Sequence, residues 1–508
     1  MFLTSIGIVI GCWVAVHAAL FLYHLLINPL RHFPGPKWDA LSQLIGSYHL
    51  VQGDSCKYIA KLHEEYGDAI RTASNELSFT TPTAWQEIYG LKTDWDNVYE
   101  KNPILYVLGP QPVSNIFFCP GKEHARIRKH IMPAFSGRAL HEQESLMRGT
   151  LDQLMDALRD RSGKANFPNQ NGVVNMAAWS IFQVTDVLTL LALGQSWDTL
   201  KSGEYPGFIT DLYGTLKDST KVRAAHRLKP YHLIIKRFVS NDFGTAFLEY
   251  FTQAQNALTA RRAEKNSDKK DFIHYVADGL TDEEMFENLN MLVVAGLDST
   301  AAILSAVIHY ITQNADCYEG LVHEIHTAFK SDEEITIASV SGLKYLKAVI
   351  DETMRLHPSV PVGLPRLVPK GGRFIDGYWV PEGTWVSVAQ YAAYRSPKYF
   401  AKPHKFIPDR WVDSTTYATD NHFVFRPFST GARGCIGKTF VIPLNVLYLK
   451  QTTNLLESFA YANIRMALAL LLWNFDLTAQ PGNIDPDSLK EFGLWEHHPV
   501  YVQVKERV

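Results

Sequence analysis

Apolar residues dominate the first part of the chain. From Ile6 to Ile27 nearly every position is Ile, Val, Leu, Ala, Phe or Trp, and Arg31 is the first Asp, Glu, Lys or Arg of the sequence. A membrane-spanning helix needs about 20 such residues, whereas a cleaved signal peptide would have a basic start and a shorter apolar run. The pattern therefore predicts a retained transmembrane anchor over residues 1–28. Arg31 and Lys37 follow it, which favours a cytosolic position for the rest of the chain.

A proline-rich segment over residues 29–37 follows the anchor. Proline fixes φ and stiffens the backbone, so we expect this segment to be a hinge. The rest of the chain, residues 38–508, contains no repeat and no Gly- or Ser-rich linker that would divide it. The sequence therefore predicts a single large domain behind the anchor, mainly α-helical with a small β region.

The hydrophobic pattern places the elements of this domain. Helical periodicity dominates from about Gly121 to about Met354. A polar run over Arg261–Asp271 is expected to be a solvated loop. Extended patterns predict two strands within Asp68–Thr80, strand structure within Gly377–Ser387 and a strand at Tyr501–Val504.

Composition excludes several classes of protein. The chain has 508 residues, 46% of them hydrophobic, which is enough to bury a large core. Lys plus Arg is 49 and Asp plus Glu is 52, so a net charge of −3 argues against binding by neutralisation of phosphates. The cysteines are scattered and never form Cys-x-x-Cys, which argues against a disulfide scaffold or a zinc cluster. They are Cys12, Cys56, Cys119, Cys317 and Cys435.

The segment around Cys435 has the composition of a tight backbone loop around a sulfur. Gly431, Gly434 and Gly437 lie within seven residues, and glycine lets a backbone approach a flat ligand closely. Backbone N–H groups could hold the sulfur as a thiolate, and Arg433 could meet an anionic group at the ligand's edge. A buried free cysteine in a glycine-rich loop is the alternative.

These residues resemble the haem-binding signature of the cytochrome P450 family, Phe-x-x-Gly-x-Arg-x-Cys-x-Gly. The five fixed positions that match are Phe428, Gly431, Arg433, Cys435 and Gly437. Two further family motifs occur upstream in the same order. The first is Glu-x-x-Arg at Glu352 and Arg355, and the second is a Pro-x-Arg-aromatic element that contains Arg410.

The resemblance covers essentially the whole chain and implies the cytochrome P450 fold. It implies haem b as cofactor, with Cys435 as the axial ligand of the iron. It also implies that Glu352, Arg355 and Arg410 form a buried charge network with a structural role. An isolated Glu/Arg pair of this spacing would otherwise be a surface pair of small value.

Three other residues resemble contacts to the haem propionates. In the family helix that matches Gly121–Lys129, His124 stands where tryptophan is usual, and Arg128 keeps the arginine four positions later. Residues four apart share one face of a helix. Arg366 resembles a further propionate contact. Without the family frame, each arginine would be read as a solvated surface charge.

Residues 291–300 resemble the helix that crosses the oxygen-binding face. Ala295 and Gly296 are expected to lie against the haem, and Asp298 with a neighbouring hydroxyl is expected to deliver protons to bound oxygen. The family usually has threonine where Ser299 stands, and Thr300 is the alternative hydroxyl. A helix whose polar residues bond only locally is the bland alternative.

The resemblance implies a monooxygenase that inserts one oxygen atom of O2 into a hydrophobic small molecule. Electrons would come from NADPH through a membrane-bound NADPH–cytochrome P450 reductase. The chain is most similar to fungal members of secondary metabolism, of the isotrichodermin hydroxylase-like type, which implies a terpenoid, polyketide or alkaloid substrate. The implied location is the endoplasmic reticulum membrane, single-pass, with a cytosolic catalytic domain. A non-oxygenating haem-thiolate isomerase or dehydratase, and an inactive haem protein, remain alternatives.

Residues 439–457 interrupt the family pattern. They separate the cysteine loop from an apolar helix predicted at Phe459–Trp473, and their removal restores an uninterrupted family sequence across Lys438 and Ser458. We interpret these 19 residues as an unspliced intron that keeps the reading frame. A genuine surface loop is the alternative, because loops tolerate insertion.

Overall fold

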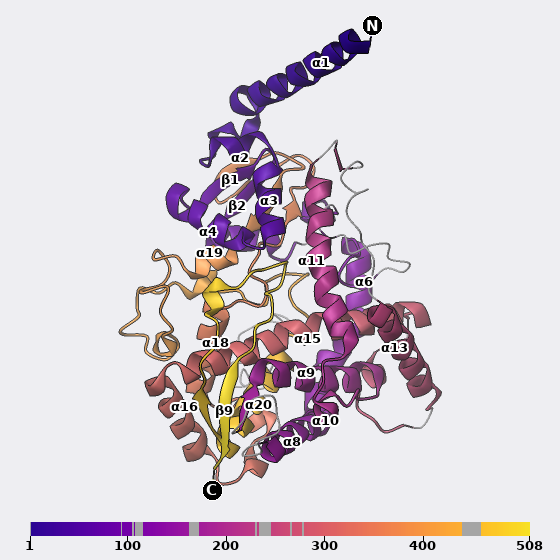
Figure 1. The fold of residues 1–508 in the computed structure, drawn as a ribbon, viewed down its shortest axis with the longest axis vertical. Coiled ribbons are helices and arrows are strands. Elements are labelled where there is room, and N and C mark those ends of the chain that lie inside the picture. The colour runs from indigo at the N-terminus through magenta and orange to yellow at the C-terminus, as the bar shows by residue number, and fades with distance from the viewer. Residues whose placement is uncertain are drawn as a thin grey trace.

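Two long helices, α9 (Met176–Leu193) and α15 (Asp282–Thr312), lie side by side through the middle of the protein (Figure 1). The structure is a computed structural model and describes residues 2–92, 94–103, 106, 115–161, 172–228, 231–232, 245–264, 267–276, 279–438 and 459–507. α15 begins with a capping box, in which Thr281 and Glu284 bond each other's backbone N–H groups. The two helices anchor the core on which the other elements pack.

The remaining helices surround this pair. They are α1 (Phe2–Leu22), α2 (Lys37–Leu41), α3 (Leu44–Gln52), α4 (Ser55–Tyr66), α5 (Pro82–Tyr89), α6 (Gly121–Ile131), α7 (Gly137–Glu142), α8 (Glu144–Arg161), α10 (Thr199–Ser202), α11 (Gly207–Arg227), α13 (Thr245–Ala263), α14 (Phe272–Tyr275), α16 (Ala315–Ala328), α17 (Ile337–Val340), α18 (Lys344–Leu356), α19 (Gln390–Tyr394) and α20 (Phe459–Asn474).

The strands form three small sheets. One has the order β1-β2-β7-β4, a second has β3-β9-β8, and β5 pairs with β6 as a hairpin. Their bounds are β1 (Ala69–Ala73), β2 (Glu76–Phe79), β3 (Val173–Asn175), β4 (Arg366–Leu367), β5 (Arg373–Ile375), β6 (Tyr378–Val380), β7 (Trp385–Val388), β8 (Phe475–Ala479) and β9 (Tyr501–Glu506). The expectation of a mainly helical protein with a small β region is confirmed.

Individual sequence predictions fare differently. The strands expected within Asp68–Thr80 are β1 and β2, the terminal strand is β9, and the predicted apolar helix is α20. β3 was missed because three residues in a helical region become a strand only by pairing with distant β9. The solvated loop was wrong at both ends, since Arg261 and Asp271 are buried and form an ion pair of 2.5 Å.

The core is divided between two main clusters. The larger contains α8, α9, α15, α18 and α20, and the smaller packs α5 against the first sheet. Leu30 and Phe33 of the hinge are buried in the smaller cluster, and the Pro34 carbonyl accepts from the Arg71 N–H at 2.8 Å. The hinge segment is thus packed against the domain.

α1 projects from the body of the protein (Figure 1). Its described apolar side chains are exposed, among them Trp13, Val16 and Leu20. α9 and α15 are also apolar and long enough to cross a membrane, but 94% and 67% of their most apolar stretches are buried in the protein. Those two are core helices.

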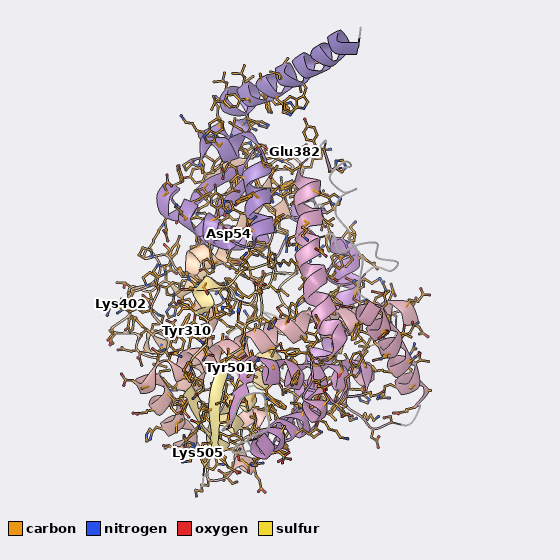
Figure 2. The ribbon with its side chains drawn as sticks, in the orientation of Figure 1. Asp54, Tyr310, Glu382, Lys402, Tyr501 and Lys505 are labelled. Atoms are coloured by element: carbon orange, nitrogen blue, oxygen red, sulfur yellow. The ribbon has the colours of Figure 1, made fainter. Side chains whose placement is uncertain are left out.

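The far end of the chain returns to the centre. Tyr501 begins β9 and Lys505 lies near its end (Figure 2). The Val500 carbonyl accepts from the Met176 N–H at 2.8 Å, so the segment before β9 is fixed to the start of α9. Tyr310, also labelled in Figure 2, stacks on Phe406 and ties the end of α15 to the irregular segment before the cysteine loop.

Candidate active site

A tight loop holds Cys435. The Cys435 N–H donates to the Phe428 carbonyl at 2.9 Å, and the Gly434 N–H donates to the Gly431 carbonyl at 3.0 Å. Gly431 has φ +75°, and a Cβ at this position would lie 1.8 Å from the carbonyl oxygen of Tyr89. Only glycine can therefore bring this loop so close to the end of α5.

The residue Cys435 is exposed, although many protein atoms lie around its sulfur. Burial raises its pKa above the ordinary value, although the Gly437 N–H and the charges of Arg128 and Lys438 oppose this. These groups alone do not hold a thiolate. A cationic iron bound to the sulfur would, because metal coordination deprotonates a thiol.

Basic side chains gather beside this loop. Arg128 of α6 donates to the Gly434 carbonyl at 2.8 Å, and Arg433 donates to Glu100 and to the Cys119 carbonyl, both at 3.0 Å. Arg366 of β4 donates to the Tyr106 hydroxyl at 2.8 Å and forms a backbone bridge with Lys101. Arg128, Arg366, Arg433, Lys101 and His124 together are called the cation cluster below.

The basic groups of the cation cluster lie close enough together to lower one another's pKa values. Burial and the nearby Arg366 and Arg433 lower the pKa of Lys101 to about 6. Burial, Arg433 and Arg128 lower the pKa of His124 to about 3, so that ring is neutral at physiological pH. Within the described residues, the buried Nη1 of Arg433 has no hydrogen-bond partner. Lys101 and His124 lose protons because a buried cation without an anion is unfavourable.

The cation cluster and the cysteine loop fit haem. Haem carries two anionic propionates at one edge and an iron that accepts a thiolate. The unpartnered nitrogen of Arg433 is a donor suited to a carboxylate. Arg128, Arg366, Arg433 and His124 were proposed as cofactor contacts from the sequence, and the structure brings them together. The sequence did not predict that Lys101 and Glu100 belong to this site, because the residues around them form no recognisable motif.

Residues 295–300 of α15 divide between two environments. Ala295 is exposed in mid-helix, and the Ser299 hydroxyl donates back to the Ala295 carbonyl at 2.8 Å. Asp298 and Thr300 are buried. A Cβ on Gly296 would lie 3.0 Å from Leu188 of α9, so glycine here allows close packing of two helices. The prediction that a ligand lies against Gly296 stays a prediction.

Asp298 has two partners that the sequence did not reveal. Its Oδ1 accepts from the Tyr213 hydroxyl of α11 and contacts Nε2 of His497, which lies before β9. Tyr213 and His497 also contact each other. Burial and the Asp298 carboxylate raise the pKa of Tyr213 well above its ordinary value, so the phenol keeps its proton.

Glu352, Arg355 and Arg410 meet in one buried network. The Glu352 carboxylate pairs with Arg355 at 2.8 Å and with Arg410 at 3.1 Å, and all three side chains are 0% exposed. Arg355 also donates to the carbonyls of Tyr394 and Pro403, 39 and 48 residues further along the chain. The network fixes α18 to the segment that leads into the cysteine loop.

The suspected insertion, residues 439–457, lies outside the described residues.

Comparison with known proteins agrees with this geometry. The Cytochrome P450 family model matches residues 34–443. Cytochrome P450 monooxygenase lnbC of Aspergillus flavus is 43% identical over 498 residues, covering 98% of this chain and 95% of that protein. Cytochrome P450 monooxygenase FrzC of Cladobotryum sp is 38% identical, covering 98% and 97%.

A third relative carries a more specific name. Fusicoccadiene 8-ol C-16 hydroxylase of Alternaria brassicicola is 31% identical, covering 99% of this chain and 98% of that protein. The similarity to these fungal enzymes extends over nearly the full length of both chains. The family match and the full-length relatives establish that the chain belongs to the cytochrome P450 monooxygenase family.

Proposed function

We propose that this chain is a haem-thiolate monooxygenase that inserts one oxygen atom of O2 into a hydrophobic small molecule. The observation that carries the proposal is the Cys435 loop beside the cation cluster, with an unpartnered buried nitrogen on Arg433. Cys435 would hold the iron of haem b, and Arg128, Arg366, Arg433 and His124 would lie at the propionates. When bound, haem with a thiolate ligand supplies the cleavage of the O–O bond.

The role of α15 in this proposal is to hold and move protons. Asp298 would act as a general acid, and Ser299 would pass the proton on. Ser299 lies on the same accessible face of α15 as Ala295. The Ser299 hydroxyl donates to a carbonyl, and its oxygen can still accept a hydrogen bond. Thr300, only 4% exposed, is less suited to this role.

The substrate in this proposal is a fungal secondary metabolite of terpenoid, polyketide or alkaloid type. The fungal relatives support this class, and one of them is named for the hydroxylation of fusicoccadiene 8-ol. NADPH–cytochrome P450 reductase would deliver the two electrons that the insertion requires.

We further propose that the chain is anchored in the endoplasmic reticulum membrane by a single span, with the catalytic domain in the cytosol. The projecting helix α1 has exposed apolar side chains. Trp38 of α2 and Tyr48 of α3 are 72% and 58% exposed, and both helices lie at the same end of the protein as α1 (Figure 1). Aromatic residues of this kind favour the interface between lipid and water.

The experiment that tests the function is the absorption spectrum of the reduced, CO-bound full-length chain, followed by NADPH oxidation with added reductase. We expect a thiolate-type Soret band that Cys435→Ala abolishes. Cys12→Ala, which removes an exposed cysteine of α1, is the matched control and should keep the band. Oxidation that needs both reductase and O2 supports a monooxygenase; a thiolate band without any O2 dependence favours an isomerase or dehydratase.

The segment 439–457 has its own test. The family match ends at residue 443, inside this segment, which supports the proposal that it interrupts the natural sequence. We expect deletion of residues 439–457 to raise the fraction of chain that binds haem, and the mature transcript to lack these codons. A transcript that retains them would refute the intron, and an undiminished Soret band of the full-length chain would show that the segment is tolerated.

A further inference from the structure

Asp298, Tyr213 and His497 come together from three separate parts of the chain. Asp298 lies on α15, Tyr213 on α11, and His497 on the segment that leads into β9. Oδ1 of Asp298, the Tyr213 hydroxyl and Nε2 of His497 are all in mutual contact. Asp298 is 1% exposed and His497 is 20% exposed. The histidine is thus more exposed than the carboxylate that it contacts.

The three contacts fix where the hydrogens lie. The Tyr213 phenol has one hydrogen, and it is donated to the Asp298 carboxylate. If Nε2 of His497 had no hydrogen, two acceptors, this nitrogen and Oδ1 of Asp298, would face each other. A hydrogen on Nε2 removes the conflict, because it can be shared between Oδ1 and the Tyr213 oxygen. The imidazole therefore presents an N–H group directly to the proposed general acid.

His497 also borders a small cavity. Its volume is about 40 Å³, and it is bordered by α15 and by the segment before β9. A cavity of this size with several polar groups in its wall can hold water. Four imidazoles border it, those of His309, His357, His497 and His498. Burial and Arg395 lower the pKa of His357 to about 3, so that ring is neutral and can accept from water.

Several other charged or titratable groups lie around Asp298, Tyr213, His497 and the cavity. They are Tyr205, His309, His357, Arg395, Glu496 and His498. Glu496 is a carboxylate next in sequence to His497 and borders the same cavity, and the carboxylate of Asp485 acts on His309. Asp298 remains the carboxylate that contacts the His497 ring.

We infer that His497 supplies Asp298 with protons from the water-sized cavity beside it. In this step the protonated imidazole of His497 gives its Nε2 hydrogen to Oδ1 of Asp298, which leaves a neutral imidazole and a carboxylic acid. The ring then takes a proton from hydronium, which leaves water, and no electrons move. Tyr213 keeps Asp298 aligned by its hydrogen bond. The inference rests on the proposed function, in which Asp298 delivers the proton to bound oxygen. His497 acts only through Asp298.

The first test needs no substrate and no turnover. Hydrogen–deuterium exchange at the imidazole C2 position, followed by mass spectrometry, reports the protonation of each histidine in the resting holoenzyme. In Asp298→Asn the C2 exchange of His497 should change, because the group in contact with its Nε2 is altered. The profile of His323, an exposed histidine of α16, is the control and should not move. An unchanged His497 profile would overturn the inference.

The second test separates proton supply from structure. In His497→Gln the amide can still donate to Asp298 but cannot carry a proton. We expect NADPH oxidation with excess reductase to fall by about tenfold or more, and the reduced CO-bound band to stay. His323→Gln, at an exposed position of α16 outside the cavity, should remain within about twofold of the parent. A His497→Gln variant as fast as the parent would refute proton supply. A missing thiolate band both in the parent and in the chain without residues 439–457 would instead refute the proposed function, and the exchange result would still decide the contact.

Discussion

Removal of the Glu352 carboxylate should be among the most damaging single substitutions in this protein. Its two oxygens accept from Nε and Nη2 of Arg355 at 2.9 and 2.8 Å, and from Nε of Arg410 at 3.1 Å. They also accept from the Ile407 N–H at 2.8 Å and from Trp411 Nε1 at 3.0 Å. Glu352→Ala would remove all five bonds and leave two guanidinium groups buried.

The magnitude follows from the burial. Breaking a buried ion pair by removing one partner costs about 3–5 kcal/mol, because the remaining charge is uncompensated. Here Asp420 still pairs with Arg410, but Arg355 keeps only carbonyl acceptors. Since a domain is stable by only about 5–15 kcal/mol, a loss of this size would remove much of the stability and loosen the segment before the cysteine loop.

The assay is urea unfolding followed by far-UV circular dichroism, with the CO-bound band as a measure of haem loading. Glu123→Ala is the matched control, because Glu123 also pairs with an arginine three residues away, Arg126, but at the surface. That control should cost less than about 1 kcal/mol. A loss below about 1 kcal/mol for Glu352→Ala, with normal haem loading, would refute the reasoning.

Three further predictions concern the loop, the cation cluster and pH. Gly431→Ala should prevent haem loading, because the new Cβ would clash with the Tyr89 carbonyl and the positive φ adds about 1–3 kcal/mol of strain; the CO-bound band measures this. Arg433→Met should speed haem transfer to apomyoglobin by about tenfold or more, the value of a charge-assisted hydrogen bond; an unchanged rate would argue against a propionate contact. Burial lowers the pKa of His63 to about 4 from 6.5, so between these values the unfolded chain binds the extra proton and stability falls as pH is lowered. The slope should reach up to about 1.4 kcal/mol per pH unit, and His63→Gln should flatten it in urea unfolding at pH 7.5 and 5.0.

Local patterns predicted much of the fold, and long-range contacts explain what they missed. Glu352 and Arg355 lie three residues apart on a helix, so their shared face could be read directly from the sequence. Trp411 and Asp420, which complete the network, come from an irregular segment without periodicity. No spacing rule connects them with α18.

The same holds for Asp298, whose partners could not be predicted from the sequence. Tyr213 and His497 are 85 and 199 residues away along the chain. A lone tyrosine in a helix and a histidine in a C-terminal loop carry no signal of their own. The burial of Arg261 was also hidden, because a polar run favours solvent unless a partner such as Asp271 is folded against it.

The pairing of β3 with β9 sets an order of events in time. Val173 of β3 pairs with Gln503 of β9, 330 positions later. At roughly 5–20 residues per second, a ribosome needs roughly 17–66 s to make the intervening chain. During that interval β3 has no partner strand, and the contact between Asp298 and His497 cannot form. α1 is made earlier and is available to a membrane throughout. The centre of the protein is therefore completed by the last residues to be synthesised, on a chain that is already tethered if α1 is the anchor we propose.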